Sequence, residues 1–189
     1  MRRVYLIRHG KPATAWGEED ADPGLDEAGH AQARAVAQAL MALAPAERPS
    51  FVVSSPLRRC LETAQPLAEA LGVAVQIDRA VGEIPTPADL SHADRPAWLR
   101  EAMSGTWSAI SGDIDYDQWR KSVAAAVGSR GDGAVFSHFV AINGVLSLVK
   151  GEDKVIVFRP DHTSCTTLEV GEQGLSVVRL GEEAATRVN

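Results

Sequence analysis

The sequence predicts a single domain of the α/β class, with three layers and a mostly parallel central β-sheet between two layers of helices. Three observations predict this class. Short apolar runs alternate along the chain with longer segments whose apolar residues recur at helical spacing. The resulting strand–helix–strand order is typical of parallel sheets that carry helices on both faces. The size also fits, because 189 residues of which 45% are apolar suit one well-buried domain, expected to span 1–189.

The apolar runs predict strands in both halves of the chain. They lie at residues 4–7, 51–54, 73–77, 134–137, 155–158, 166–170 and 175–180. The last two flank the sequence GEQG, which predicts a β-hairpin. In the final run Leu175 and Val177 alternate with Val178 and Leu180, so the two pairs are predicted to face opposite sides of the sheet.

Five helices are predicted between these strands. They cover residues 26–43, a segment from Pro56 to Leu71, residues near 95–104, about 115–128 and about 140–149. Asp26 and Ser55 are the predicted N-caps of the first two helices, with Pro56 at the first helical position. Residues 84–112 contain three prolines and two tryptophans, and we expect this stretch to form a cap inserted over one edge of the domain.

The composition narrows the classes of partner and the cellular compartment. The formal net charge is −6, which argues against nucleic acid or an anionic membrane as partner, although local arginines can still bind an anionic substrate. Cys60 and Cys165 stand in no metal-binding spacing and are expected to be reduced thiols. The apolar run at 4–7 is too short for a signal-peptide core, and no run approaches the ~20 residues of a membrane span. We therefore expect a cytoplasmic protein, of undetermined oligomeric state.

Polar and charged side chains follow the carboxyl ends of four predicted strands. They are Arg8 and His9, Arg58 and Arg59, Glu83, and His138. Ligands bind at this edge of a parallel sheet, and arginines together with a helix N-terminus favour a phosphoryl group. A neutral imidazole can attack phosphorus, and a protonated carboxyl group can protonate the leaving alkoxide. The two neighbouring arginines are equivalent on the helical wheel, so their spacing does not choose between them.

Four sequence motifs resemble those of the histidine phosphatase superfamily, which includes phosphoglycerate mutases and acid phosphatases. They are LIRHG at 6–10, DPGLDEAGHAQA at 22–33, SSPLRRCLETA at 54–64 and VFSH at 135–138. The resemblance extends from residue 4 to about residue 170. It implies that His9 is the histidine that becomes phosphorylated and that Arg8 binds the phosphate beside it. The family pattern places a second phosphate-binding arginine directly before a small residue, and because Cys60 stands there, this is Arg59.

The rest of the implied site combines two residues that match the family pattern with two that depart from it. His138 matches the second active-site histidine and Glu83 matches the proton donor. Nearby arginines favour the ionised form of Glu83 whereas burial favours the neutral form, and the sequence does not decide which effect is larger. Two departures concern the phosphate contacts. Ala15 stands where the family often has asparagine, with Thr14 as a candidate replacement, and Phe139 follows the second histidine where glycine is common, leaving its backbone N–H as a candidate donor.

The resemblance implies a metal-independent phosphomonoesterase without a cofactor, acting through a phosphohistidine on His9 with Glu83 as acid. Its partner would be a small phosphorylated metabolite or a phosphoprotein. A phosphoglycerate-type mutase is less favoured, because the family's mutases carry arginine directly after the proton donor and this chain has Ile84. A non-catalytic phospho-ligand-binding module on the same fold is the other alternative. The segment 84–112, with Trp98, is expected to form a specificity wall over the site, unless its tryptophans simply belong to the core.

Two further patterns are weaker signals. DIDYD at 113–117 resembles the start of a calcium loop, but Gln118 stands where glycine is needed, so we interpret it as a solvated turn before a helix. HTSC at 162–165 has no second pair of metal ligands near it in the sequence. Thr163 and Ser164 are therefore expected to be turn residues or to line the site.

Overall fold

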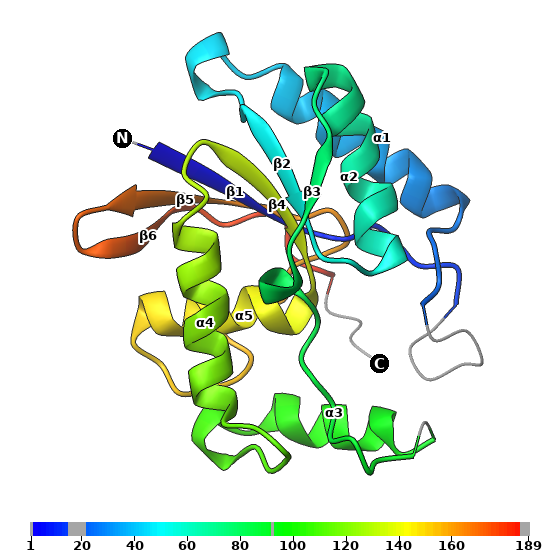
Figure 1. Cartoon of the computed structure of the whole chain (residues 1–189), viewed down its shortest axis with the longest axis vertical. Helices are drawn as coiled ribbons and strands as arrows, with labels where there is room; N and C mark the ends of the chain where they lie inside the picture. Colours follow the sequence, from blue (N-terminus) through cyan, green and yellow to red (C-terminus); the bar gives the residue numbers. More distant parts are fainter. Residues whose placement is uncertain (1, 15–21, 92, 186–189) are drawn as a thin grey trace.

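The computed structural model describes residues 2–14, 22–91 and 93–185 of the chain. These residues form one six-stranded sheet with the order β3-β2-β4-β1-β5-β6. The strands are β1 (Arg2–Arg8), β2 (Phe51–Ser54), β3 (Val75–Ile77), β4 (Gly133–Ser137), β5 (Cys165–Gly171) and β6 (Gly174–Arg179). β1 to β4 run parallel to one another, whereas β5 pairs antiparallel with both β1 and β6. The predicted α/β class with a mostly parallel sheet is confirmed (Figure 1).

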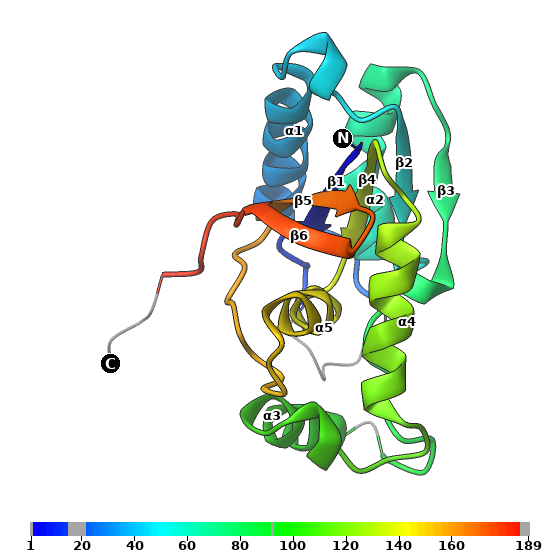
Figure 2. The same ribbon diagram turned by 90° about the vertical axis from the view of Figure 1, so that its left-hand side faces the viewer.

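Helices cover both faces of this sheet because its central strands are apolar on both sides. The helices are α1 (Glu27–Met41), α2 (Arg58–Leu71), α3 (Arg95–Ser104), α4 (Tyr116–Gly128) and α5 (Phe139–Lys150). In β1, Tyr5 and Ile7 pack with α1 and α2, whereas Val4 and Leu6 pack with α4 and α5. Figure 2 shows α1 and α5 on opposite sides of β5. Among the described residues, no helix combines the length and apolar character needed to cross a bilayer.

The hairpin and the first helix cap follow the sequence pattern. β5 and β6 pair as an antiparallel hairpin, with Leu175 and Val177 packed on the core and Val178 and Leu180 exposed. Asp26 caps α1, since its side chain accepts a hydrogen bond from the backbone N–H of Gly29. Both predictions are confirmed.

The predicted strand at 155–158 is wrong. These residues form an irregular segment in which the backbone N–H groups of Val157 and Phe158 both donate to the side-chain oxygen of Asn143, over 2.9 and 3.0 Å. A side chain of α5 thus satisfies the groups that a neighbouring strand would otherwise bind. Val155 and Phe158 are buried, so the apolar run reflects burial in a loop.

Two boundaries also differ from the prediction. The strand expected at 73–77 is limited to β3 at its carboxyl half. The second helix begins at Arg58, and Leu57 occupies its N-cap position without a side-chain hydrogen bond, so Ser55 is not the N-cap. Leu57 is extended, with φ −71° and ψ 138°, so the helix starts two residues later than predicted and Pro56 is not its first residue.

The segment 84–112 contains α3 and a short 3₁₀ helix, η3 (Trp107–Ala109). It lies below the sheet in Figure 1. Trp107 is buried with Ile84, Tyr116 and Val140 in a third apolar cluster, against which Trp98 packs half-buried. One of the two tryptophans is therefore a core residue, and only Trp98 remains available to line a surface.

Candidate active site

The candidate site begins where β1 ends. His9 follows the last residue of β1, and its backbone N–H donates to Ser137 at the end of β4 over 3.0 Å. The next residue, Gly10, donates to the buried Thr63 hydroxyl of α2 over 2.9 Å. A Cβ on Gly10 would lie 2.8 Å from the Gly29 carbonyl oxygen, so only glycine permits this close approach of β1 to α1. The backbone around His9 is thus fixed from three sides.

The partners of His9 assign its tautomer. Its Nδ1 lies 2.8 Å from the carbonyl oxygen of Gly10, which can only accept, so Nδ1 carries the hydrogen and Nε2 keeps a lone pair. The side chain is 5% exposed. Burial, reinforced by the charges of Arg59 and Arg8, holds the pKa of His9 well below its usual range. The neutral imidazole of His9 is therefore favoured, and its Nε2 has no hydrogen-bond partner among the described residues.

Arg59, Glu83 and His138 meet beside His9. The Arg59 Nη2 atom lies 3.4 Å from Glu83 Oε2 and 3.3 Å from His138 Nδ1, and His138 Nδ1 lies 3.3 Å from the same carboxylate oxygen. The ring centres of His9 and His138 are 5.3 Å apart. Three different elements of the fold, α2, the loop after η2 (Arg79–Val81) and the end of β4, supply these groups. Arg58 instead points to solvent and pairs with Glu62, so the structure brings Arg59, not Arg58, to the site.

The carboxyl group of Glu83 is largely shielded from solvent. Its side chain is 18% exposed, and Oε1 accepts from the backbone N–H of Ile84 over 3.2 Å. Burial raises the pKa of Glu83 above its usual value, and the charges of Arg59 and Arg8 oppose this rise without cancelling it. The structure thus answers the question that the sequence left open: burial outweighs the neighbouring charges, so the balance shifts toward the protonated form.

His138 is fully buried. Burial, followed by the neighbouring His9, Arg59 and Arg8, holds the pKa of His138 well below its usual range. Its second ring nitrogen, Nε2, lies 2.8 Å from the Ser55 hydroxyl. The sequence analysis assigned Ser55 to a helix cap and so missed this contact.

The rim of the site carries Arg8 and two aromatic rings. Arg8 donates to the carbonyl of Pro160 over 3.0 Å, and its guanidinium carbon lies 5.2 Å from the centre of the Phe139 ring. Phe139 is also the first residue of α5, so its backbone N–H has no partner within the helix. The ring of His162 lies 6.1 Å from that of His9. Burial and the charge of Arg8 lower the pKa of His162 to about 4.

The sequence analysis did not connect His162 with the site. HTSC was considered as a metal-binding pattern, and Thr163 and Ser164 as turn residues or lining of the site, but no role was given to His162 itself. Because β5 pairs antiparallel with β1, the residues before β5 lie beside the end of β1. Thr163 has a φ of 58°, so it is a turn residue as expected.

The phosphate contact predicted at Thr14, in place of the one missing at Ala15, is only partly described. The Thr14 hydroxyl oxygen is buried and finds no hydrogen-bond partner among the described residues. Ala15 lies outside the described residues. The replacement of the family's asparagine by Thr14 therefore stays a prediction.

The aspartates at 113–117 have ordinary structural roles. Asp115 caps α4 by accepting from the Gln118 N–H, Asp113 accepts from the backbone of Ala88, and Asp117 pairs with α4 side chains. The turn before a helix is confirmed. Within the described ranges, no three metal-binding side chains gather in one place.

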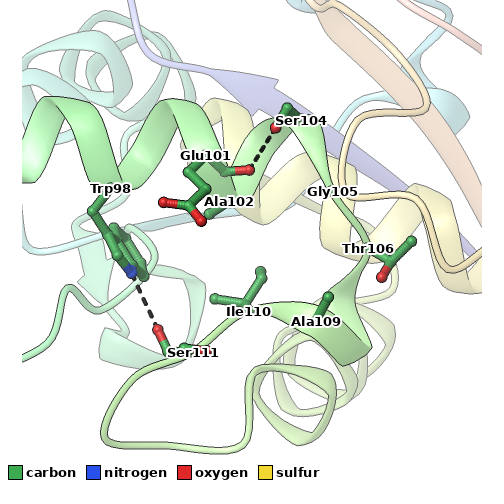
Figure 3. Close-up of a pocket in the computed structure, with 9 residues that line it drawn as sticks. All are labelled: Trp98, Glu101, Ala102, Ser104, Gly105, Thr106, Ala109, Ile110 and Ser111. Atoms are coloured by element: carbon green, nitrogen blue, oxygen red, sulfur yellow. Dashed lines mark hydrogen bonds between the residues drawn. The ribbon is translucent and has the colours of Figure 1, made fainter.

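A cavity of about 250 Å³ lies within the segment 84–112 and is drawn in Figure 3. Trp98, Glu101 and Ile110 contribute to its wall, and the Trp98 ring nitrogen donates to the backbone carbonyl of Ser111 over 3.1 Å. None of the side chains assembled around His9 lines it. The cavity is thus separate from the candidate site.

Comparison with known proteins agrees with this geometry. A model of the histidine phosphatase superfamily (branch 1) matches residues 4–183. The chain is 32% identical to glucosyl-3-phosphoglycerate phosphatase of Mycobacterium tuberculosis over 129 residues, which are 61% of this chain and 55% of that protein. It is 30% identical to "Probable phosphoglycerate mutase GpmB" of Erwinia tasmaniensis over 117 residues, 56% of this chain and 52% of that protein. The match thus spans about half the length of these curated relatives.

Solved structures share the whole fold. Phosphoserine phosphatase from Entamoeba histolytica, in complex with 3-phosphoglyceric acid, superposes with a TM-score of 0.75 at 21% identity and covers 96% of this chain and 98% of its own. The mycobacterial glucosyl-3-phosphoglycerate phosphatase complexed with VO3 superposes with a TM-score of 0.68 at 26% identity, covering 97% of this chain and all of its own.

Proposed function

This chain belongs to the histidine phosphatase superfamily, and we propose that it hydrolyses phosphomonoesters through a phosphohistidine formed on His9. The observation that carries the proposal is the tautomer of His9. The hydrogen bond from Nδ1 to Gly10 leaves the Nε2 lone pair free, and the lowered pKa of His9 keeps that lone pair unprotonated. A nucleophile held in this state next to a carboxyl group whose pKa is raised suits displacement at phosphorus.

The proposed reaction has two displacements. In the first, the Nε2 lone pair of His9 forms a bond to phosphorus, the phosphorus–oxygen ester bond breaks, and Glu83 gives its proton to the leaving oxygen. In the second, water attacks the phosphohistidine, Glu83 takes a proton from that water, and the phosphorus–nitrogen bond breaks. Inorganic phosphate leaves, and both His9 and Glu83 return to their starting states.

The charge on the phosphoryl oxygens is offset by protein groups in this proposal. Arg8 and Arg59 supply guanidinium donors, and His138 supplies a ring nitrogen. The backbone N–H of Phe139 and the hydroxyl of Thr14 are further candidate contacts. Because two arginines flank the phosphoryl group, the proposed chemistry requires no metal ion.

Hydrolysis is favoured over phosphoryl transfer to a second substrate. Ile84, where the family's mutases carry arginine, is 3% exposed and packs in the core, so it supplies no cation for a substrate carboxylate. The relatives described above include phosphatases for glucosyl-3-phosphoglycerate and phosphoserine. By this likeness, we propose a small phosphorylated metabolite as the substrate class.

The test is phosphate release from p-nitrophenyl phosphate in excess EDTA, followed by a panel of phosphorylated metabolites and one phosphoprotein. Metal-independent turnover, together with an acid-labile phosphoenzyme, is the expected result. His9→Ala should abolish both, whereas His30→Ala, which removes an exposed histidine, should leave both unchanged. Binding of phosphate without any turnover would mean that the protein is a phospho-ligand-binding module and not an enzyme.

A further inference from the structure

We propose that Ser55 is a positioning residue for His138. Its hydroxyl changes from hydrogen-bond acceptor to donor when a phosphoryl group binds, so that an uncharged His138 can donate to that group. The inference rests on the role proposed above for His138 as a phosphate contact, and it adds the residue whose hydroxyl lets either ring nitrogen of His138 carry the hydrogen.

The Ser55 hydroxyl is placed for this role by the backbone around it. Ser55 is fully buried, and its N–H donates to Phe136 of β4 over 3.0 Å, two residues before His138. Its Oγ accepts from the N–H of Leu57 over 3.3 Å. A hydroxyl has one hydrogen and two lone pairs, so one lone pair and the hydrogen remain for His138 Nε2, 2.8 Å away.

The other ring nitrogen of His138, Nδ1, contacts hydrogen-bond donors in the free protein and an acceptor when a phosphoryl group is bound. Without a phosphoryl group, Arg59 Nη2 is 3.3 Å from His138 Nδ1. Arg59 can only donate, and Glu83 Oε2, 3.3 Å from the same nitrogen, also donates when it carries the acid proton. Nδ1 therefore offers its lone pair, Nε2 carries the hydrogen and Ser55 accepts. With a phosphoryl group bound, the Arg59 donors turn to its oxygens and the Glu83 proton turns to the leaving oxygen. Nδ1 then faces a phosphoryl oxygen, which can only accept, so the hydrogen belongs on Nδ1 and Ser55 donates to Nε2.

A change of tautomer is less costly here than a change of charge. His138 is fully buried. The groups around it are two fixed cations, Arg8 and Arg59, the imidazole ring of His9 and the carboxyl group of Glu83. Burial and the like charges oppose an imidazolium, as the lowered pKa of His138 shows. Moving one hydrogen between ring nitrogens satisfies both states without adding a buried charge.

Cys60 contacts the same nitrogen but cannot replace Ser55. Its sulfur lies 3.4 Å from His138 Nε2, while its S–H points to the carbonyl oxygen of Ser137 over 3.5 Å. Burial also raises the pKa of the Cys60 thiol. Among the described residues at Nε2, the serine hydroxyl is therefore the group able both to give and to accept a hydrogen bond.

The direct test is the ¹⁵N spectrum of His138 in the wild-type protein, with and without inorganic phosphate. The expected result is a neutral ring in both states, with the unprotonated, pyridine-type nitrogen at Nδ1 in the free protein and at Nε2 in the complex. An imidazolium in the complex, or one tautomer throughout, would overturn the proposal.

A matched pair of variants tests the role of the hydroxyl. Ser55→Ala should raise the dissociation constant for inorganic phosphate about tenfold at neutral pH. Relative to wild type, this loss should shrink as the pH falls, because protonation of His138 then supplies the missing hydrogen. Ser54→Ala removes a neighbouring buried hydroxyl that donates to the Ser55 carbonyl and should change binding less than twofold.

An equal loss in both variants, or a loss independent of pH, would assign Ser55 a merely structural role. Because the readouts are phosphate binding and ring protonation, they can fail while turnover through His9 persists. If Ser55→Ala does not fold, the wild-type spectrum still decides.

Discussion

Two buried arginines, Arg59 and Arg120, show how the same side chain is used differently in two parts of the molecule. They are 5% and 7% exposed, and each lies on a helix. Arg120 of α4 bonds to Asp117 over 2.7 Å, to the Ser147 hydroxyl over 3.0 Å and to the Glu152 carbonyl over 2.9 Å. Arg59 has no side-chain partner closer than 3.3 Å among the hydrogen bonds of the described residues.

The difference distinguishes an arginine whose charge stabilises the fold, Arg120, from one whose charge is available to a ligand, Arg59. A buried cation is stable when good hydrogen bonds replace its lost water. Arg120 meets this condition within the protein and also lies over the Trp107 ring, 5.5 Å from its centre, so it ties α4 to the segment 84–112. The hydrogen bonds of Arg59 within the protein are long and replace its lost water poorly. This is expected of a guanidinium group that binds a ligand.

The largest expected effect is on Arg59. Arg59→Ala should lower kcat/KM for p-nitrophenyl phosphate by about 10³-fold, since it removes a donor aimed at the charge of the transition state. Because its bonds within the protein are long, the free energy of unfolding should change by less than about 1 kcal/mol. The matched control is Arg58→Ala, the exposed neighbour, which should retain wild-type kcat/KM. A collapse of stability in Arg59→Ala with activity retained per folded molecule would reverse the comparison.

Glu83, the carboxyl partner of Arg59, should control the alkaline side of the pH profile. Its pKa is raised, and it must be protonated to act as acid, so kcat/KM should fall as the pH rises through that raised pKa. The lowered pKa of His9 puts the acid limb well below 6.5, because only the neutral ring attacks. Glu83→Gln should lose about 10²-fold with an alkyl phosphate and lose the alkaline limb.

The leaving group provides the control for Glu83. Nitrophenolate needs little protonation, so Glu83→Gln should be impaired less with p-nitrophenyl phosphate than with an alkyl phosphate. Equal loss with both substrates would mean that Glu83 acts by position or charge instead of by giving a proton.

Arg120 should show the opposite pattern to Arg59. Arg120→Met should reduce the free energy of unfolding by about 2 kcal/mol, because four hydrogen bonds are lost, while removal of the cost of burying a cation offsets part of that loss. Urea unfolding measures this, and kcat/KM per folded molecule should stay within about twofold of wild type. A large loss of kcat/KM at unchanged stability would place Arg120 with the site and remove the distinction.

The sequence was a good guide wherever one residue's local environment decides its structure. Asp26 caps its helix, and the hairpin alternates as predicted, because turn chemistry and period-two burial are local properties. The strand expected at 155–158 failed because Asn143, distant in sequence, satisfies its backbone. The periodicity of a short apolar run cannot distinguish such a loop from a strand.

The site was predictable as a set of residues but not as a network. The strand-end rule and the family motifs identified His9, Arg59 and His138, and the structure brings them together. Their roles remain proposals. The sequence analysis missed the contacts of Ser55 and His162 because they depend on register across the sheet. Ser55 follows β2, which pairs with β4, and His162 precedes β5, which pairs with β1.

The smallest expected effect tests the segment 84–112, where the two regions meet. The segment begins with Ile84 directly after Glu83 and includes Trp107 under Arg120, so it touches both the site and the scaffold. Trp98 packs half-buried against the same apolar cluster as Trp107.

If the segment forms a specificity wall, Trp98→Ala should change the ratio of kcat/KM between bulky and compact phosphomonoesters by about threefold to tenfold, acting through KM. Trp98→Phe keeps a ring while losing the hydrogen bond to Ser111, so it should change stability but not that ratio. An unchanged ratio in Trp98→Ala would assign the segment to the scaffold alone.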